Sequence, residues 1–162
     1  MYFLTRYIAF EASHFYRIPE LNDQENYQLF GHKANPNGHG HNYALYLTVK
    51  GNVNPVNGMV LNIKQLDDTI RGYVDQHYDH KLINLQHPVF SVDPHLQPTP
   101  ENIVMQVWQA INRRLKKVEI AELRLDEDER LYTVYYGAEQ MVHLTRTYEF
   151  SAAHRLHSFE LS

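Results

Sequence analysis

Two histidines separated by one glycine are the residues whose types and spacing most directly suggest chemistry. His39 and His41 begin a segment, residues 39–50, in which apolar side chains occupy every second position. Because the side chains of a strand alternate between its two faces, both imidazoles should point the same way. A third histidine, His14, lies at the end of the first strand-like segment. A catalytic zinc ion typically takes three protein ligands and leaves a fourth position open, so these histidines form a candidate zinc site.

A simpler interpretation of the same residues is also open. Alternation alone places many polar pairs on strands, so His39 and His41 could be two solvent-facing residues, and His14 an ordinary half-buried histidine. The chain contains no cysteine. Disulfides, thiolate metal ligands and a thiol nucleophile are therefore excluded, and any catalytic base must be another residue type.

The elements that must position these histidines can be read from the pattern of the chain. Residues 19–38 are polar and contain two prolines and two glycines, which predicts a long loop. Asn62 and Thr99 can each cap a helix that follows with one apolar stripe. Strand patterns are predicted at residues 2–12, 39–50, 59–61, 118–125 and 131–137.

This order of elements favours a fold class. Few strands alternate with helices, so the sequence predicts an α+β domain with an antiparallel four-stranded sheet and two helices on one of its faces. The 162 residues are 43% hydrophobic and 21% charged, which fits one globular domain with its own core.

Composition also excludes several classes of partner. The formal net charge is −4, so bulk charge gives no attraction to nucleic acid or to anionic lipid. No apolar run approaches the roughly 18 residues of a membrane span. The N-terminal residues lack the basic flank and cleavage site of a signal peptide, which predicts a cytoplasmic protein.

Part of the first strand recurs near the end of the sequence, at a constant offset of 140 residues. The recurring residues are Leu4, Thr5, Arg6, Phe10, Ala12 and His14, matched by Leu144, Thr145, Arg146, Phe150, Ala152 and His154. We interpret residues 1–137 as one domain, and residues 138–162 as a linker and the first strand of a truncated second repeat. The alternative is a coincidental amphipathic strand. The trailing segment is too short to fold alone, so it either pairs with a sheet edge or is disordered.

A set of short motifs carries a family resemblance. In order they are ASH at 12–14, PNGHGHNY at 36–43, NGMVLN at 57–62, YDHKLIN at 78–84 and PTPEN at 98–102, followed by Glu127 in the penultimate strand. Together they resemble the 6-pyruvoyl-tetrahydropterin synthase family, which includes the 6-carboxytetrahydropterin synthases and has the tunnelling fold (T-fold). The resemblance covers roughly residues 3–137. The long loop before the His-Gly-His step is more similar to the pyruvoyl-type enzymes.

The resemblance implies roles for individual residues. Its zinc ligands fall on His14, His39 and His41, in agreement with the spacing. Its pterin-anchoring carboxylate falls on Glu127, which could accept two parallel N–H bonds from the pterin edge. Thr99 matches a position beside the pterin. Without the resemblance, Glu127 would read as a solvated charge and Thr99 as a plain helix cap.

The family's proton relay is matched only in part. Asp79 and His80 match its aspartate and histidine, and a carboxylate can orient an imidazole that transfers protons near neutral pH. The family's cysteine is replaced by Lys33. A lysine base would have to lower its pKa from about 10.4 by roughly two to three units. Lys33 could instead bind substrate phosphate or lie on a mobile loop, and His32 is a second candidate base.

The function implied is that of a zinc-dependent carbon–oxygen lyase acting on 7,8-dihydroneopterin triphosphate. The alternative is a zinc- and pterin-binding half of a tandem-repeat protein that has no catalytic activity. The resemblance also implies a homo-trimer or homo-hexamer in which neighbouring sheets close a barrel, and barrel closure removes exposed sheet edges.

Overall fold

The sheet is the frame of the molecule. The structure, a computed structural model, describes residues 1–155. Six strands lie in the order β3-β1-β2-β4-β5-β6. Their bounds are β1 Tyr2–His14, β2 His39–Gly51, β3 Lys81–Leu82, β4 Glu119–Asp128, β5 Leu131–Tyr136 and β6 Met141–Arg146. All pairings are antiparallel except the short contact between β1 and β3. The predicted α+β class is confirmed, and the sheet has two strands more than the four expected.

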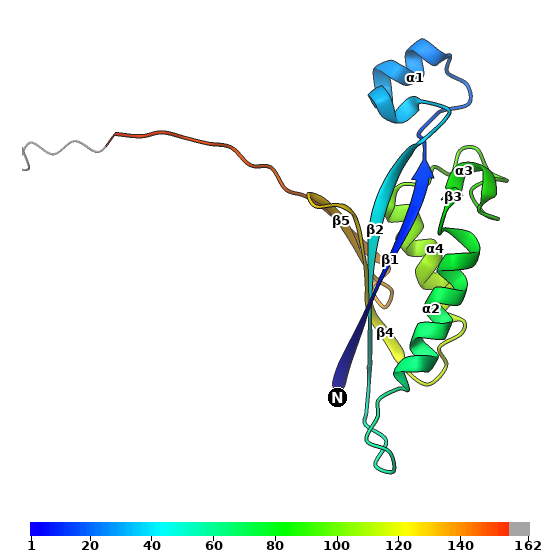
Figure 1. The fold of residues 1–162 in the computed structure, drawn as a ribbon, viewed down its shortest axis with the longest axis vertical. Helices are drawn as coiled ribbons and strands as arrows, with labels where there is room; N and C mark the ends of the chain where they lie inside the picture. Colours follow the sequence, from blue (N-terminus) through cyan, green and yellow to red (C-terminus); the bar gives the residue numbers. More distant parts are fainter. Residues whose placement is uncertain (156–162) are drawn as a thin grey trace, which may run out of the picture.

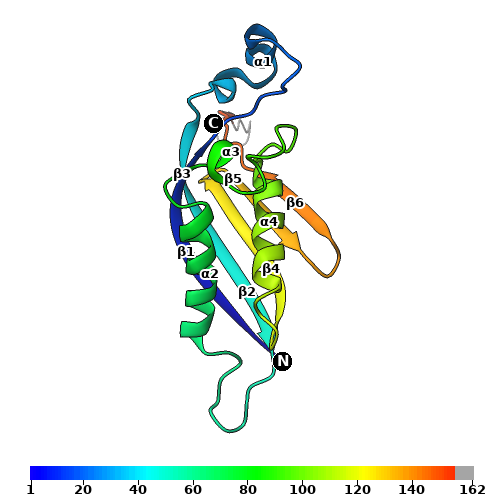
Figure 2. The same ribbon diagram turned by 90° about the vertical axis from the view of Figure 1, so that its right-hand side faces the viewer.

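Two helices cover one face of this sheet, as Figures 1 and 2 show. Helix α2 spans Ile63–His77 and helix α4 spans Pro100–Asn112. The predicted caps are confirmed, because the Asn62 side chain accepts from the Lys64 amide and the Thr99 hydroxyl accepts from the Asn102 amide. The apolar stripes of both helices are buried against the sheet, so burial of these side chains, at about 1.5–3 kcal/mol each, holds the layers together.

The strand face under the helices carries the core and ends in histidines. On β1, Ile8, Phe10 and His14 are buried, and on β2, Tyr43 and Leu45 are buried. These positions differ by even numbers, as the period of a strand requires. The same alternation that buries the apolar residues therefore carries the histidines to one end of the covered face.

The prediction of a structureless loop over residues 19–38 is wrong. Helix α1 spans Asp23–Phe30 and a 3-10 turn, η1, spans Gly31–Ala34. The helix begins with a capping box in which the Asn22 side chain and the Glu25 carboxylate each bind the other residue's backbone amide. The Asn-x-x-Glu spacing was visible in the sequence, but α1 has few buried side chains to mark it.

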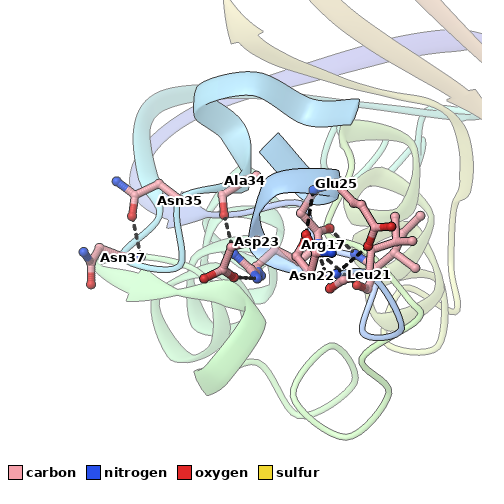
Figure 3. Close-up of polar contacts among 10 residues, drawn as sticks. Arg17, Leu21, Asn22, Asp23, Glu25, Ala34, Asn35 and Asn37 are labelled. Atoms are coloured by element: carbon pink, nitrogen blue, oxygen red, sulfur yellow. Dashed lines mark hydrogen bonds and ion pairs between the residues drawn. The ribbon is translucent and has the colours of Figure 1, made fainter. Parts of the chain in front are cut away.

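Arg17 ties this insertion to the body of the protein (Figure 3). Its guanidinium donates to the Asp23 carboxylate and to the Ala34 carbonyl, the latter at 3.1 Å. Asn26, which is fully buried, donates to the Leu21 carbonyl at 2.9 Å. These bonds satisfy the backbone of the insertion and fix the path that leads into β2.

One further expectation needs correction, because residues 59–61 form no strand. They follow a turn closed by Gly58, with φ +70°, and lead directly into α2. The segment between the two helices contains β3 and one helical turn, α3, spanning Ile83–Gln86. Among residues 1–155, no helix combines the length and apolar character needed to span a bilayer.

The trailing segment pairs with the sheet edge. Strand β6 runs antiparallel to β5, with Leu144 opposite Thr133 and Arg146 opposite Leu131. Of the two alternatives for the trailing segment, pairing with a sheet edge is the one observed for residues 141–146. The end of the proposed second repeat, residues 156–162, lies outside the described residues.

Candidate metal centre and substrate site

The three histidines predicted to bind a metal meet at one end of the covered face. His14 and His39 are opposite each other in the β1–β2 pairing, and His41 is opposite Ala12. One ligand nitrogen from each histidine lies within 4.8 Å of the others. Because two residues come from adjacent positions of one strand face and the third from its paired neighbour, the sheet register itself assembles the cluster.

The imidazole of His14 is held by a backbone carbonyl. Its Nδ1 lies 2.7 Å from the Pro98 oxygen, and since a carbonyl can only accept, Nδ1 carries the proton. The other nitrogen, Nε2, then presents its lone pair to the cluster. An outer-shell bond of this kind is how metal-binding histidines are usually oriented.

The remaining cluster nitrogens are buried without partners. Nε2 of His14, both ring nitrogens of His39 and Nε2 of His41 make no hydrogen bond within residues 1–155. A buried polar atom without a partner costs free energy, so this group of atoms needs a ligand. Three neutral imidazoles suit zinc, and the residues present fit such an ion.

The electrostatics keep the cluster neutral. Burial lowers the pKa of His14 to about 3 and that of His39 to about 4. The pKa of His41 is also lowered by burial, while the charge of Glu127 opposes that effect. Neutral imidazoles are the metal-binding form, so the environment favours coordination over protonation.

Glu127 lies beside this cluster and is paired with Lys33. The lysine Nζ donates to the glutamate Oε1 at 3.0 Å, and the same oxygen lies 3.5 Å from Nε2 of His41. Glu127 is 1% exposed, and its Oε2 makes no hydrogen bond within the described residues. A buried carboxylate thus has one oxygen neutralised by an ammonium and one oxygen available to a ligand.

The position of Lys33 follows from the insertion. Its backbone carbonyl, in η1, accepts from the Tyr16 amide at 2.9 Å, and its Nζ lies 5.5 Å from the centre of the Tyr16 ring. His32, the other candidate base, instead packs edge-on against Tyr27 and faces a separate pocket with Arg17. Of these two adjacent residues, the lysine is the one that reaches Glu127.

Thr99 lies on the wall of a cavity that also contains Lys33. The cavity, about 620 Å³, is further lined by Tyr16 and Leu131. Capping α4 and facing the cavity are compatible, because the cap places the hydroxyl at the helix terminus. The volume suits a small organic ligand.

Asp79 and His80 lie apart from Lys33, at the open edge of β1. The His80 Nδ1 is 2.9 Å from Asp79 Oδ2, and the backbone amide of Glu11 donates to Asp79 Oδ1 at 3.0 Å. That backbone bond is the main cause of the lowered pKa of Asp79. His80, at φ +55°, is 74% exposed in its side chain and shares a shallow pocket with His41. The pair is oriented, but solvent reaches it.

Three residues of the site were not predicted from the sequence. Tyr16 and Tyr43 pack their rings against His14, and Pro98 supplies the carbonyl that orients it. Burial raises the pKa of Tyr43 well above its usual value. Tyrosine is abundant in the chain, and a backbone carbonyl leaves no trace in residue type, so no local signal distinguished them.

Comparison with known proteins agrees with the fold and the site. The family model described as 6-pyruvoyl tetrahydropterin synthase matches residues 3–138. The 6-pyruvoyl tetrahydrobiopterin synthase of Pongo abelii is 35% identical, covering 83% of this chain and 90% of the relative; that of Drosophila melanogaster is 37% identical, covering 83% and 79%. The solved structure of the Caenorhabditis elegans 6-pyruvoyl tetrahydropterin synthase superposes with a TM-score of 0.74 and 25% identity, over 84% of this chain and 95% of that one.

The match extends over the elements that hold the histidines, the glutamate and the two helices, which together are nearly the whole globular part. A similarity of this extent, in sequence and in fold, is not produced by a shared architecture alone. The chain belongs to the 6-pyruvoyl tetrahydropterin synthase family.

Proposed function

We propose that this chain is a zinc-dependent lyase that acts on 7,8-dihydroneopterin triphosphate, releasing triphosphate and rearranging the pterin side chain. The observation that carries the proposal is the convergence of three neutral histidines, with unpartnered nitrogens, beside a buried carboxylate that has one free oxygen. Relatives of this chain are named as 6-pyruvoyl tetrahydrobiopterin synthases. Family membership by itself indicates a pterin synthase function in tetrahydropterin metabolism.

His14, His39 and His41 would hold the zinc ion. When bound, zinc supplies Lewis acidity that makes the side-chain protons of a coordinated substrate easier to remove. The histidines contribute neutral ligands, and the Pro98 carbonyl keeps one of them in the correct tautomer.

Glu127 would anchor the pterin ring. Its Oε2 is free, but its Oε1 is bound by Lys33, so the bidentate interaction requires the ammonium to move aside. Thr99 and Tyr16 line the adjoining cavity and would border the ring. Binding of substrate and release of Lys33 are therefore coupled in this proposal.

Asp79 and His80 would transfer protons to and from the substrate. The carboxylate holds the imidazole by its Nδ1 and leaves Nε2 directed outwards, 3.8 Å from Glu11. An oriented, solvent-accessible imidazole can exchange protons between a bound substrate and water. Lys33, once displaced from Glu127, is the second candidate for proton transfer.

A second candidate function is a zinc- and pterin-binding unit without catalysis. Two observations favour it: the chain has no cysteine, and Lys33 occupies the carboxylate that would bind the pterin. Under this alternative, the lysine is a permanent partner of Glu127 and catalysis belongs to another copy.

We further propose assembly into a trimer or hexamer, and a cytoplasmic location. On its outer side β1 pairs with β3 only at Ala12 and Ser13, so the rest of that edge is open. Tyr2, Phe3 and Tyr7 are exposed there. An open edge with aromatic side chains is normally covered by another chain.

The deciding experiment is incubation of zinc-loaded protein with 7,8-dihydroneopterin triphosphate, with product masses measured by mass spectrometry. We expect release of triphosphate and formation of a 6-substituted tetrahydropterin. Lys33→Cys and Lys33→Ala are compared with the native chain. Loss of activity in Lys33→Ala with gain in Lys33→Cys would assign Lys33 to the chemistry. If zinc binds stoichiometrically and no variant turns over substrate, the non-catalytic alternative replaces the proposal.

A further inference from the structure

Strand β6 contributes a wall to the cavity beside Lys33. In an antiparallel pair, residues opposite each other project to the same side of the sheet. Leu144 is opposite Thr133 and Arg146 is opposite Leu131, and both β5 residues are buried on the covered side. Leu144 and Arg146 therefore face the same side as the histidine cluster, and with Tyr148 they line the 620 Å³ cavity.

Arg146 differs in its surroundings from the arginine that it repeats. Arg6, its counterpart at an offset of 140, lies on the same side of β1 and pairs with Asp67 of α2, its NH2 donating to Oδ2 at 2.9 Å. Within residues 1–155 no carboxylate pairs with Arg146; its guanidinium lies 5.6 Å from the centre of the Tyr148 ring. The repeated residue thus presents its charge to the cavity.

The cavity combines apolar walls with cations at separate places. Phe30, Leu131 and Leu144 supply apolar surface, and Lys33 and Arg146 supply positive charge. Glu101, on the first turn of α4, is the acidic group on the same wall. A ligand with a flat apolar part and an anionic tail complements this arrangement, provided that its tail lies on the Arg146 side.

We propose that Arg146 binds the phosphate-bearing end of the pterin substrate, so that the segment after the first domain completes the substrate site. This inference rests on the proposed function. A guanidinium presents several N–H groups in one plane and can donate two of them to one phosphate. When the pterin takes the Glu127 carboxylate, the released Lys33 ammonium becomes a second cation in the same cavity.

The test compares two unreactive oxidised pterins that differ only in the triphosphate group: neopterin triphosphate and neopterin. Their dissociation constants are measured by pterin fluorescence for native zinc-loaded protein and for Arg146→Gln. We expect Arg146→Gln to raise the dissociation constant of neopterin triphosphate about tenfold, because one charge-assisted contact is lost. The dissociation constant of neopterin should change less than about twofold. Arg146→Lys, which keeps the charge but not the planar fork, should fall between.

Arg130→Gln is the matched control. Arg130 is an exposed arginine that precedes β5, pairs with Glu149 at 3.5 Å and does not line the cavity. It should leave both dissociation constants unchanged. Equal weakening of both ligands by Arg146→Gln, or no weakening of either, overturns the assignment of Arg146. Native protein that binds neither pterin overturns the proposed function itself, whereas equal binding of both pterins overturns only the phosphate role.

Discussion

Two histidine-containing regions of this protein occupy opposite environments. The cluster of His14, His39 and His41 lies at one end of the covered face, with unpartnered nitrogens and pKa values lowered by burial. The pair of Asp79 and His80 lies at the open edge of β1, with an imidazole that lies 2.9 Å from the carboxylate and is 74% exposed. Residue type alone would treat these histidines alike.

The difference suits the two regions to different chemistry. An imidazole that stays neutral and lacks a hydrogen-bond partner is suited to a metal ion, whereas one that is oriented by a carboxylate and open to water is suited to proton exchange. The following five experiments test whether these roles are as separate as their environments.

The largest effect is expected from removing a ligand of the buried cluster. His39→Ala leaves two ligands and should weaken zinc binding at least about a hundredfold and abolish turnover, measured by competition with a chromophoric chelator. His80→Ala is the control and should keep the native zinc affinity. Equal zinc loss in both variants would show that the two regions form one site.

The exposed pair should affect turnover without affecting binding. Asp79→Asn removes the charge that orients His80, and His80→Ala removes the imidazole; each should lower kcat about a hundredfold, as for a general acid–base group. Zinc content and the affinity for neopterin should stay within about twofold of native. Native kcat in both variants would move proton transfer to Lys33.

The third test is the dependence of zinc affinity on pH. Because the pKa of His14 is about 3 and that of His39 about 4, these ligands remain neutral as the pH falls below the ordinary value of 6.5. We expect zinc affinity to change less than about threefold between pH 7 and 5.5, followed by steep loss near pH 4. Isothermal titration across this range measures it, and a tenfold loss by pH 5.5 would contradict the burial of the cluster.

In the metal-free protein the same lowered pKa values act on stability. Unfolded imidazoles take up protons near pH 6.5 and the buried ones only near pH 3 to 4, so the unfolded state binds more protons between these values. The free energy of unfolding should therefore fall as the pH is lowered through this window. Bound zinc should leave that dependence in place, because zinc-bound imidazoles take up no proton in this window while the unfolded ones still do.

The smallest effect concerns the support of the cluster. Thr99→Ala removes the cap of α4 beside Pro98, whose carbonyl holds His14. We expect a loss of about 1 kcal/mol in the free energy of unfolding, measured with urea, and a change in zinc affinity of no more than severalfold. Thr69→Ala, in the middle of α2, where the hydroxyl donates to the Gln65 carbonyl and caps no helix, serves as the comparison and should cost less.

The sequence predicted the buried cluster far better than its surroundings. His39 and His41 follow from strand alternation, and both helix starts follow from their caps. Helix α1 was missed although Asn22 and Glu25 mark its start, because amphipathic periodicity is the stronger signal and α1 buries little. The sequence did not decide whether the β6 segment pairs with the sheet or is disordered. Strand pairing depends on a partner strand, which the local pattern does not identify.

By itself, the sequence determined which side chains share a face and where α2 and α4 begin, since both depend on the local period of the chain and on residues within one turn. Only the tertiary structure decided that Lys33 pairs with Glu127, which is 94 positions away, and that Arg146 faces the same cavity. These encounters depend on the order of strands in the sheet and on the path of the insertion. Neither leaves a mark in the spacing of residues, because contacts between distant segments are set by packing of the whole domain.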